Sequence, residues 1–135
     1  MPTYVFACVA NAGRSQMAAA FFNHLVAPES AQAVSAGTSP ASAVHPEVLE
    51  AMKELGIDLS DARPRKLTTE VAEKATLLVT MGCGEESPNV PGLRTDDWPV
   101  ANPKGRPLEE VRVIREEIRR RVEKLIAEEG LPVKS

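Results

Sequence analysis

The stretch of sequence that decides the fold is Cys8-Val9-Ala10-Asn11-Ala12-Gly13-Arg14-Ser15. Residues 3–7 before it are rich in β-branched and aromatic side chains, which predicts a strand, and residues 16–22 after it predict a helix. The stretch is therefore a loop that joins a strand end to a helix start. Arg14 is the only side chain with a permanent charge between Met1 and Pro28, which is natural for a buried element that holds one anion.

Small residues in this loop let backbone N–H groups converge on one point. The helix N-terminus adds a partial positive charge, and Arg14 adds a planar fork of donors. These features predict a cradle for a tetrahedral oxyanion, built from consecutive residues: Val9, Ala10, Asn11, Ala12, Gly13 and Arg14.

The same electrostatic field favours the thiolate form of Cys8, so we expect Cys8 to be largely ionised at neutral pH. A thiolate beneath a bound oxyanion is a nucleophile aimed at the central atom of that oxyanion. Ser15 is placed either to hydrogen-bond the thiolate or to cap the helix. The alternative is that Cys8 is a buried structural cysteine and Arg14 an ordinary charge at a helix start.

Length and composition predict one soluble domain that spans residues 1–135. The chain has 43% hydrophobic and 26% charged residues and a net charge of -3, which argues against a nucleic-acid partner. No apolar run approaches the ~20 residues that cross a bilayer, so we expect a cytoplasmic protein with no membrane partner. Two cysteines in such a chain suggest thiol chemistry more than a stabilising structural disulfide. We expect no metal and no bound cofactor.

The order of the predicted elements is typical of an α/β fold with a four-stranded parallel sheet flanked by helices on both faces. Apolar runs and turn residues predict strands at 3–7, 33–37, 76–81 and 93–98. Helical periodicity predicts helices at 15–26, 46–55, 68–73 and 107–128. We expect the first helix to pack on the sheet and the last helix to cover its other side.

The second cysteine, Cys83, follows the buried strand 76–81 between two glycines. In open parallel sheets, sites gather outside the carboxyl ends of the strands, and both cysteines stand at such an end. If the two strands are neighbours, the thiols lie on one edge, and Gly82 and Gly84 give the segment freedom to move. The alternative is an inert cysteine after a buried strand.

Three further features leave alternatives open. His45 is a proton carrier or, more commonly for a histidine at a helix start, a neighbour of the cap. His24 is packed or at the rim of its helix. The basic run 63–66 borders an anion site or is a solvated loop.

The pattern Cys-x5-Arg-Ser after the first strand resembles the signature of the low-molecular-mass protein tyrosine phosphatase superfamily. The fuller string Cys8-x-x-Asn11-x-x-Arg14-Ser15-Gln16-Met17-Ala18 looks most like its arsenate reductase branch. The resemblance implies a low-molecular-mass phosphatase-like fold. It also implies that arsenate binds the loop, Cys8 forms an adduct with arsenic, and Cys83 attacks Cys8. Arsenite then leaves behind a Cys8–Cys83 disulfide.

The chain departs from the family pattern at two positions. The family carries an aspartate as proton donor after the tryptophan, whereas this chain has Asn102 at that general-acid position, and an amide is no acid. Asp96 or Asp97 would replace it only if the alignment slipped. Many relatives also carry a third cysteine where this chain has Ser87. The implied reductant is then an external thiol: thioredoxin, or a low-molecular-weight thiol with a glutaredoxin-like protein.

Three functions remain open on these grounds. The first is an arsenate reductase, because reduction needs a second thiol and no activated water. The second is a low-molecular-mass protein tyrosine phosphatase with a phosphocysteine intermediate, impaired by Asn102. The third is a non-catalytic binder of arsenate, phosphate or sulfate.

Overall fold

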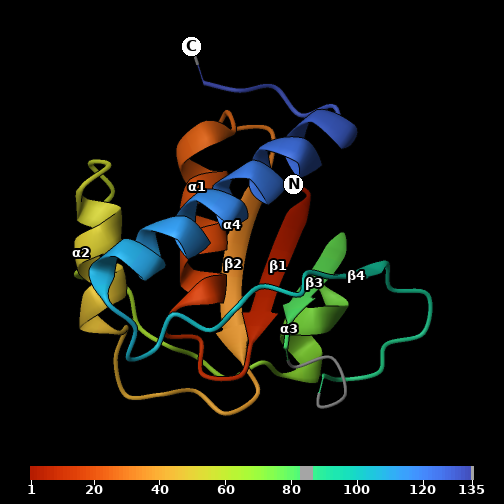
Figure 1. Cartoon of the computed structure of the whole chain (residues 1–135). Helices are drawn as coiled ribbons and strands as arrows, with labels where there is room; N and C mark the ends of the chain where they lie inside the picture. Colours follow the sequence, from red (N-terminus) through yellow and green to blue (C-terminus); the bar gives the residue numbers. More distant parts are fainter. Residues whose placement is uncertain (83–86, 135) are drawn as a thin grey trace.

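The computed structural model describes residues 1–82 and 87–134, and Figure 1 shows its fold. The described residues form a four-stranded parallel sheet in the order β2-β1-β3-β4. Its strands are β1 (Thr3–Cys8), β2 (Gln32–Gly37), β3 (Leu77–Met81) and β4 (Thr95–Asp97). The helices are α1 (Arg14–Leu25), α2 (Pro46–Lys53), α3 (Thr69–Glu73) and α4 (Leu108–Glu128). The predicted α/β architecture is confirmed.

The sheet is buried on both faces, because side chains of β1 alternate between two apolar clusters. Tyr4 and Phe6 point to the larger cluster, where their rings lie 4.9 and 6.1 Å from that of Phe22 on α1. Val5 and Ala7 belong to the smaller cluster on the opposite face, with α3 packed against it. Helices therefore flank both faces, as predicted.

The prediction that the last helix covers the other side of the sheet is wrong. The apolar stripe of α4, which includes Ile118 and Val122, belongs to the same cluster as Phe22 of α1. Figure 1 shows α4 crossing the same face as α1, with α3 behind the sheet. The handedness rule for parallel strands fixes only helices that connect two strands. Since no strand follows α4, that rule does not say which face of the sheet this helix covers.

Helix α2 is tied to α4 through Arg112 and Arg115, which both bind Glu54 at the end of α2. Buried Arg115 donates to the carbonyl oxygen of Ala51 over 2.9 Å and to Glu54 Oε1 over 2.7 Å. Hydrogen bonds from Arg112 and Arg115 lower the pKa of Glu54 to about 2. This contact matters for the site because α2 begins directly after His45.

The free edge of β2 is closed by side chains and by a later segment. Asn23 donates to the carbonyl oxygen of Ala33 and accepts from its N–H, at 2.9 and 2.8 Å. Gly37 exchanges hydrogen bonds with residues 65 and 67 at 2.8 and 2.7 Å. None of the described helices has the length and apolar character that a membrane crossing requires.

Candidate active site

The loop at residues 9–13 lies at the carboxyl end of β1, one of the two central strands. Gly13 is the N-cap residue of α1, and its carbonyl oxygen accepts from the N–H of Met17 over 3.0 Å. The loop therefore joins a strand end to a helix start, as the sequence predicts. Gly37 of β2 packs so closely that a Cβ there would lie 2.5 Å from the carbonyl oxygen of Val9.

Cys8 is buried at the end of β1, and its Sγ lies 2.9 Å from Ser15 Oγ. Ser15 Oγ also accepts from Asn11 Nδ2 over 2.7 Å. A thiolate has no hydrogen to donate, so in the ionised form of Cys8 the Ser15 hydroxyl is the donor across this contact. Of the two roles expected for Ser15, the structure places it against the thiol, since it makes no capping hydrogen bond.

Asn11 is fully buried and holds the loop in shape. It has a φ of 51°, in the left-handed region that asparagine tolerates better than most residues. Gln16 Nε2 donates to its carbonyl oxygen over 3.0 Å, and the N–H of Arg65 donates to its Oδ1 over 2.9 Å. The side chain of Asn11 thus supports the loop and orients Ser15 from behind.

Arg14 is fixed between two segments that are far apart in the sequence. Its Nη1 donates to the carbonyl oxygen of Val100 over 3.1 Å. A Cβ at Gly82, just after β3, would lie 2.9 Å from the same nitrogen. The guanidinium is therefore held by the segment that follows β4 and by the end of β3.

A pocket of about 200 Å³ opens over the loop. Loop residues and three later side chains line it: Cys8, Val9, Ala10, Gly13, Arg14, His45, Asn102 and Lys104. Of the residues predicted to bind an oxyanion, Asn11 and Ala12 are fully buried and do not line the pocket. The structure thus brings Cys8, Arg14 and Asn102 together.

Two lining residues were missed or given little weight in the sequence. The N–H of His45 donates to the carbonyl oxygen of Ala12 over 2.9 Å, and a Cβ at Gly13 would lie 3.5 Å from His45 Cδ2. Burial lowers the pKa of His45; Lys104 lowers it further, and Glu47 opposes the shift. His45 precedes a helix at the carboxyl edge of the sheet, and that position is the signal that could have found it. Lys104 lies in a turn with no such signal.

Residues 3–132 match the family described as low molecular weight phosphotyrosine protein phosphatase. The chain belongs to this family. A Halobacterium salinarum protein provisionally named an arsenate reductase is 39% identical over 127 residues, covering 91% of this chain and 89% of its own length.

Solved structures of arsenate reductases are similar to this chain. A thioredoxin-dependent arsenate reductase of Corynebacterium glutamicum has a TM-score of 0.79 and 38% identity over 95% of this chain, which spans only 61% of that protein. An arsenate reductase in its oxidized state has a TM-score of 0.84 and 32% identity. One in its phosphate-binding state has a TM-score of 0.81 and 30% identity. Each of these two matches covers 95% of this chain and 98% of the other.

The phosphatase-like pocket of this family member has an amide where an acid is expected. Asn102 lines the pocket, and its Oδ1 accepts from the N–H of Lys104 over 3.1 Å. The two nearby carboxylates are engaged elsewhere: Asp96 accepts from Trp98 Nε1 over 3.2 Å, and Asp97 accepts from Thr80 Oγ1 over 2.7 Å. Neither of them lines the pocket.

The basic run 63–66 contributes backbone and not side chains to this site. The N–H of Arg65 supports Asn11, and Lys66 Nζ donates to the carbonyl oxygen of Thr38. None of the four side chains lines the pocket over the loop. His24 is exposed on α1, away from the loop.

Cys83, with residues 84–86, lies outside the described residues. What precedes it is described. Strands β1 and β3 are neighbours, and Cys8 pairs with Met81, two residues before Cys83 in the sequence. Gly82 lies against the guanidinium of Arg14.

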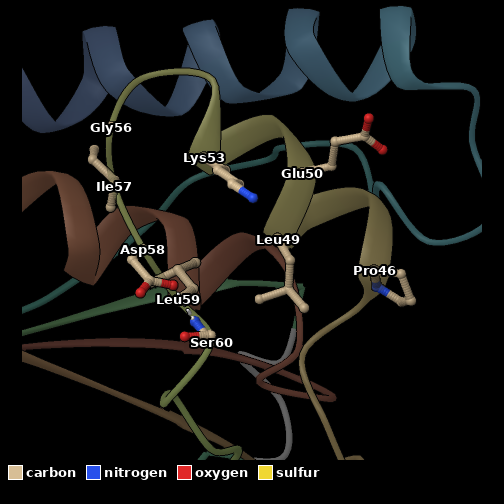
Figure 2. Close-up of a pocket in the computed structure, with 9 residues that line it drawn as sticks. All are labelled: Pro46, Leu49, Glu50, Lys53, Gly56, Ile57, Asp58, Leu59 and Ser60. Atoms are coloured by element: carbon tan, nitrogen blue, oxygen red, sulfur yellow. Dashed lines mark hydrogen bonds between the residues drawn. The ribbon is translucent and has the colours of Figure 1, made fainter.

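A larger pocket, of about 800 Å³, lies beside α2 and the segment that follows it (Figure 2). Its side chains come from residues 46–60, with Leu49, Ile57 and Leu59 mixed with Glu50 and Lys53. It contains none of the residues that the sequence predicts for thiol or oxyanion chemistry. The smaller pocket over the loop is therefore the candidate active site.

Proposed function

We propose that this chain is an arsenate reductase. The observation that carries the proposal is the chain of hydrogen bonds that links Asn11, Ser15 and Cys8 beneath the pocket. Arg14 lines this pocket, and Asn102, an amide, lines it where a phosphatase would have its general acid. The similar arsenate reductases, one of them solved in a phosphate-binding state, support the same activity.

The first step needs a thiolate and donors for an oxyanion. The Cys8 thiolate attacks arsenic, a sulfur–arsenic bond forms, and an arsenic–oxygen bond breaks. The departing oxygen leaves as hydroxide or water, with protons from solvent. Arg14 and the backbone N–H groups of the loop stabilise the oxyanion, and the Ser15 hydroxyl, 2.9 Å from the sulfur, is placed to donate to the attacking thiolate. Because hydroxide is a small leaving group that solvent protonates, Asn102 is no obstacle to this step.

The second step needs another thiol, and we assign it to Cys83. Its thiolate attacks Cys8 Sγ and forms a disulfide, while the sulfur–arsenic bond breaks and its electron pair stays on arsenic. Arsenic is reduced by two electrons and leaves as arsenite. The pairing of Cys8 with Met81 and the contact of Gly82 with Arg14 support this assignment, because both bring the end of β3 to the pocket.

An external thiol then returns two electrons to the Cys8–Cys83 disulfide. The chain has two cysteines, so no third thiol can take over the disulfide and a reductant must act on it directly. The thioredoxin-dependent relative supports thioredoxin, and a low-molecular-weight thiol with a glutaredoxin-like protein is the alternative. Such reductants belong to a reducing compartment, which is the reason to place the protein in the cytoplasm.

Mass spectrometry of the protein after arsenate treatment without reductant tests the proposal. The wild type should lose about 2 Da, the mass of two hydrogens, and the loss should map to the peptides that contain Cys8 and Cys83. Cys83→Ser should stop turnover and leave an arsenic adduct on Cys8. A Cys83→Ser variant that turns over arsenate at the wild-type rate would refute the role of Cys83.

Tyrosine phosphatase activity is the second candidate, because the family match and the Cys8–Arg14 loop fit it equally. A phosphatase must protonate a phenol and then activate water, and Asn102 does neither. Hydrolysis of an aryl phosphate that survives Cys83→Ser would favour this candidate. A protein that binds sulfate but turns over nothing with any reductant would be an oxyanion binder alone.

A further inference from the structure

The pocket over the loop is lined by cations and hydrogen-bond donors, with no aspartate or glutamate from the described part of the chain. Two of its lining residues carry positive charges, and they come from different elements. Arg14 begins α1, and Lys104 lies in the turn between β4 and α4. A pocket with this balance favours ligands that carry more than one negative charge.

Asn102 adds a donor to this pocket and not an acceptor. Its Oδ1 accepts from the N–H of Lys104, so the amide oxygen is turned toward the backbone of the turn. The amide nitrogen makes no hydrogen bond within residues 1–82 and 87–134 and is left as a donor. An aspartate at this position would keep the same turn but bring a negative charge to the pocket.

His45 does not supply a third positive charge at neutral pH. Burial and Lys104 lower its pKa, and Glu47 only partly opposes them. Glu47 is itself engaged by the turn, since its Oε1 accepts from the N–H of Gly105 over 3.3 Å. At a pH above its ordinary pKa, His45 is therefore neutral. Lys104 is then the residue that brings a positive charge to this side of the pocket.

The turn that carries Lys104 is held against the loop. Pro103 is buried, and a Cβ at Gly13 would lie 2.9 Å from Pro103 Cγ. Arg14 bonds the carbonyl oxygen of Val100, and Gly105 bonds Glu47. These contacts on both sides of Lys104 keep its backbone at the mouth of the pocket. Lys104 is exposed and lines the pocket, so its ammonium group approaches the pocket from a turn whose backbone is held in place.

We propose that Lys104 makes this pocket selective for tetrahedral dianions, so that the substrate is a free oxyanion in its doubly charged form. This inference rests on the proposed function, because it identifies the charge state of the oxyanion that the same loop binds. It assigns to Lys104 a role in specificity and leaves bond making to Cys8.

Two tetrahedral anions whose charges do not change near neutral pH provide the test: sulfate carries two negative charges and perchlorate carries one. Coulomb energy scales with the ligand's charge, so the effect of Lys104 on a dianion should be the square of its effect on a monoanion. We expect Lys104→Gln to raise the Kd of sulfate about tenfold and that of perchlorate about threefold at low ionic strength. Titration calorimetry measures both.

The matched control is Lys124→Gln, which removes the same charge from an exposed position on α4. It should leave both dissociation constants within about 1.5-fold of wild type, since a distant surface charge is screened. Equal factors for sulfate and perchlorate in Lys104→Gln, or no change in either, would overturn the inference. So would a wild-type protein that does not bind sulfate.

Kinetics separate this inference from the proposed function. With arsenate and a thiol reductant, Lys104→Gln should raise KM about tenfold and leave kcat nearly unchanged. If the wild type reduces arsenate but Lys104→Gln changes neither the Kd of sulfate nor the KM of arsenate, the specificity role of Lys104 is refuted and the proposed function stands. If sulfate binding depends on Lys104 but no reductant supports turnover, the function fails and the charge selectivity stands.

Discussion

Asn11 Nδ2 donates to Ser15 Oγ over 2.7 Å, and the same oxygen lies 2.9 Å from Cys8 Sγ. The hydroxyl accepts from the amide, and it becomes the donor to the sulfur when Cys8 is a thiolate, which has no hydrogen to give. Asn11 is held in turn by Gln16 and by the backbone of Arg65. The surroundings of the proposed nucleophile thus depend on residues that do not line the pocket.

Ser15→Ala should lower kcat about 10- to 100-fold, because a hydrogen bond to a charged group contributes about 1.5–3 kcal/mol. The Kd of sulfate should change less than about threefold, since Arg14 and the loop N–H groups remain. Steady-state kinetics and calorimetry measure the two quantities. Ser42→Ala, at an exposed position, is the control. An unchanged kcat in Ser15→Ala would show that the thiolate does not depend on this hydrogen bond.

Asn102→Asp should raise the hydrolysis of an aryl phosphate about 100-fold, the lower end of what a general acid contributes. The aspartate can keep the turn bond to the N–H of Lys104 that Asn102 now makes. The same change should weaken sulfate binding, because it brings a negative charge to the pocket. Stopped-time assays with an aryl phosphate measure the rate, and Asn89→Asp is an exposed control. No gain in hydrolysis would argue that the pocket cannot position a phosphate ester.

His45 makes the folded protein sensitive to mild acid. Its pKa in the folded state lies below the ordinary value of 6.5, with burial as the main cause. The unfolded chain therefore binds a proton more readily, and stability is lost as pH falls below 6.5. We expect the free energy of unfolding to fall less between about pH 7.5 and 5.5 in His45→Gln than in the wild type. Urea titrations at both values measure this difference.

The control for His45 is His24→Gln, since His24 is exposed on α1. This variant should follow the wild type at both pH values. If His45→Gln loses as much stability on acidification as the wild type does, then another group causes the acid sensitivity.

The sequence predicted correctly those elements that a local motif or an uninterrupted apolar run marks. The stretch from Cys8 to Ser15 predicted the strand, the loop and the helix, and the apolar run 76–81 predicted the buried strand found at Leu77–Met81. The face of α4 was predicted wrongly, because no strand follows it and periodicity does not say which face of a sheet a stripe covers. His45 was given little weight and Lys104 none, since only the folded chain brings their turns to the edge that holds Cys8.

The role of Asn11 shows the same limit at the scale of one side chain. The sequence placed it among the residues that bind the oxyanion, whereas the structure buries it behind the loop with a φ of 51°. Its partner Arg65 is 54 residues away in the sequence. Nothing in the local pattern indicates that pairing, because it depends on how the segment after α2 returns to β2.

Gly82→Ala should impair both stability and catalysis, and the two effects can be separated. Gly82 has a φ of +89°, and a Cβ there would lie 2.9 Å from Arg14 Nη1. Gly92→Ala is the matched control, because Gly92 has a φ of +80° with no atom within 4 Å of the added Cβ. Both variants should lose about 1–2 kcal/mol of stability from the left-handed backbone.

Only Gly82→Ala should also displace the guanidinium, so we expect its kcat/KM for arsenate to fall about tenfold or more while Gly92→Ala stays near wild type. Urea titration gives the stability, and initial rates give kcat/KM. Equal losses of kcat/KM in the two variants would mean that the contact between Gly82 and Arg14 does not position the guanidinium. A loss confined to Gly82→Ala would place the end of β3, directly before Cys83, in the geometry of the oxyanion site.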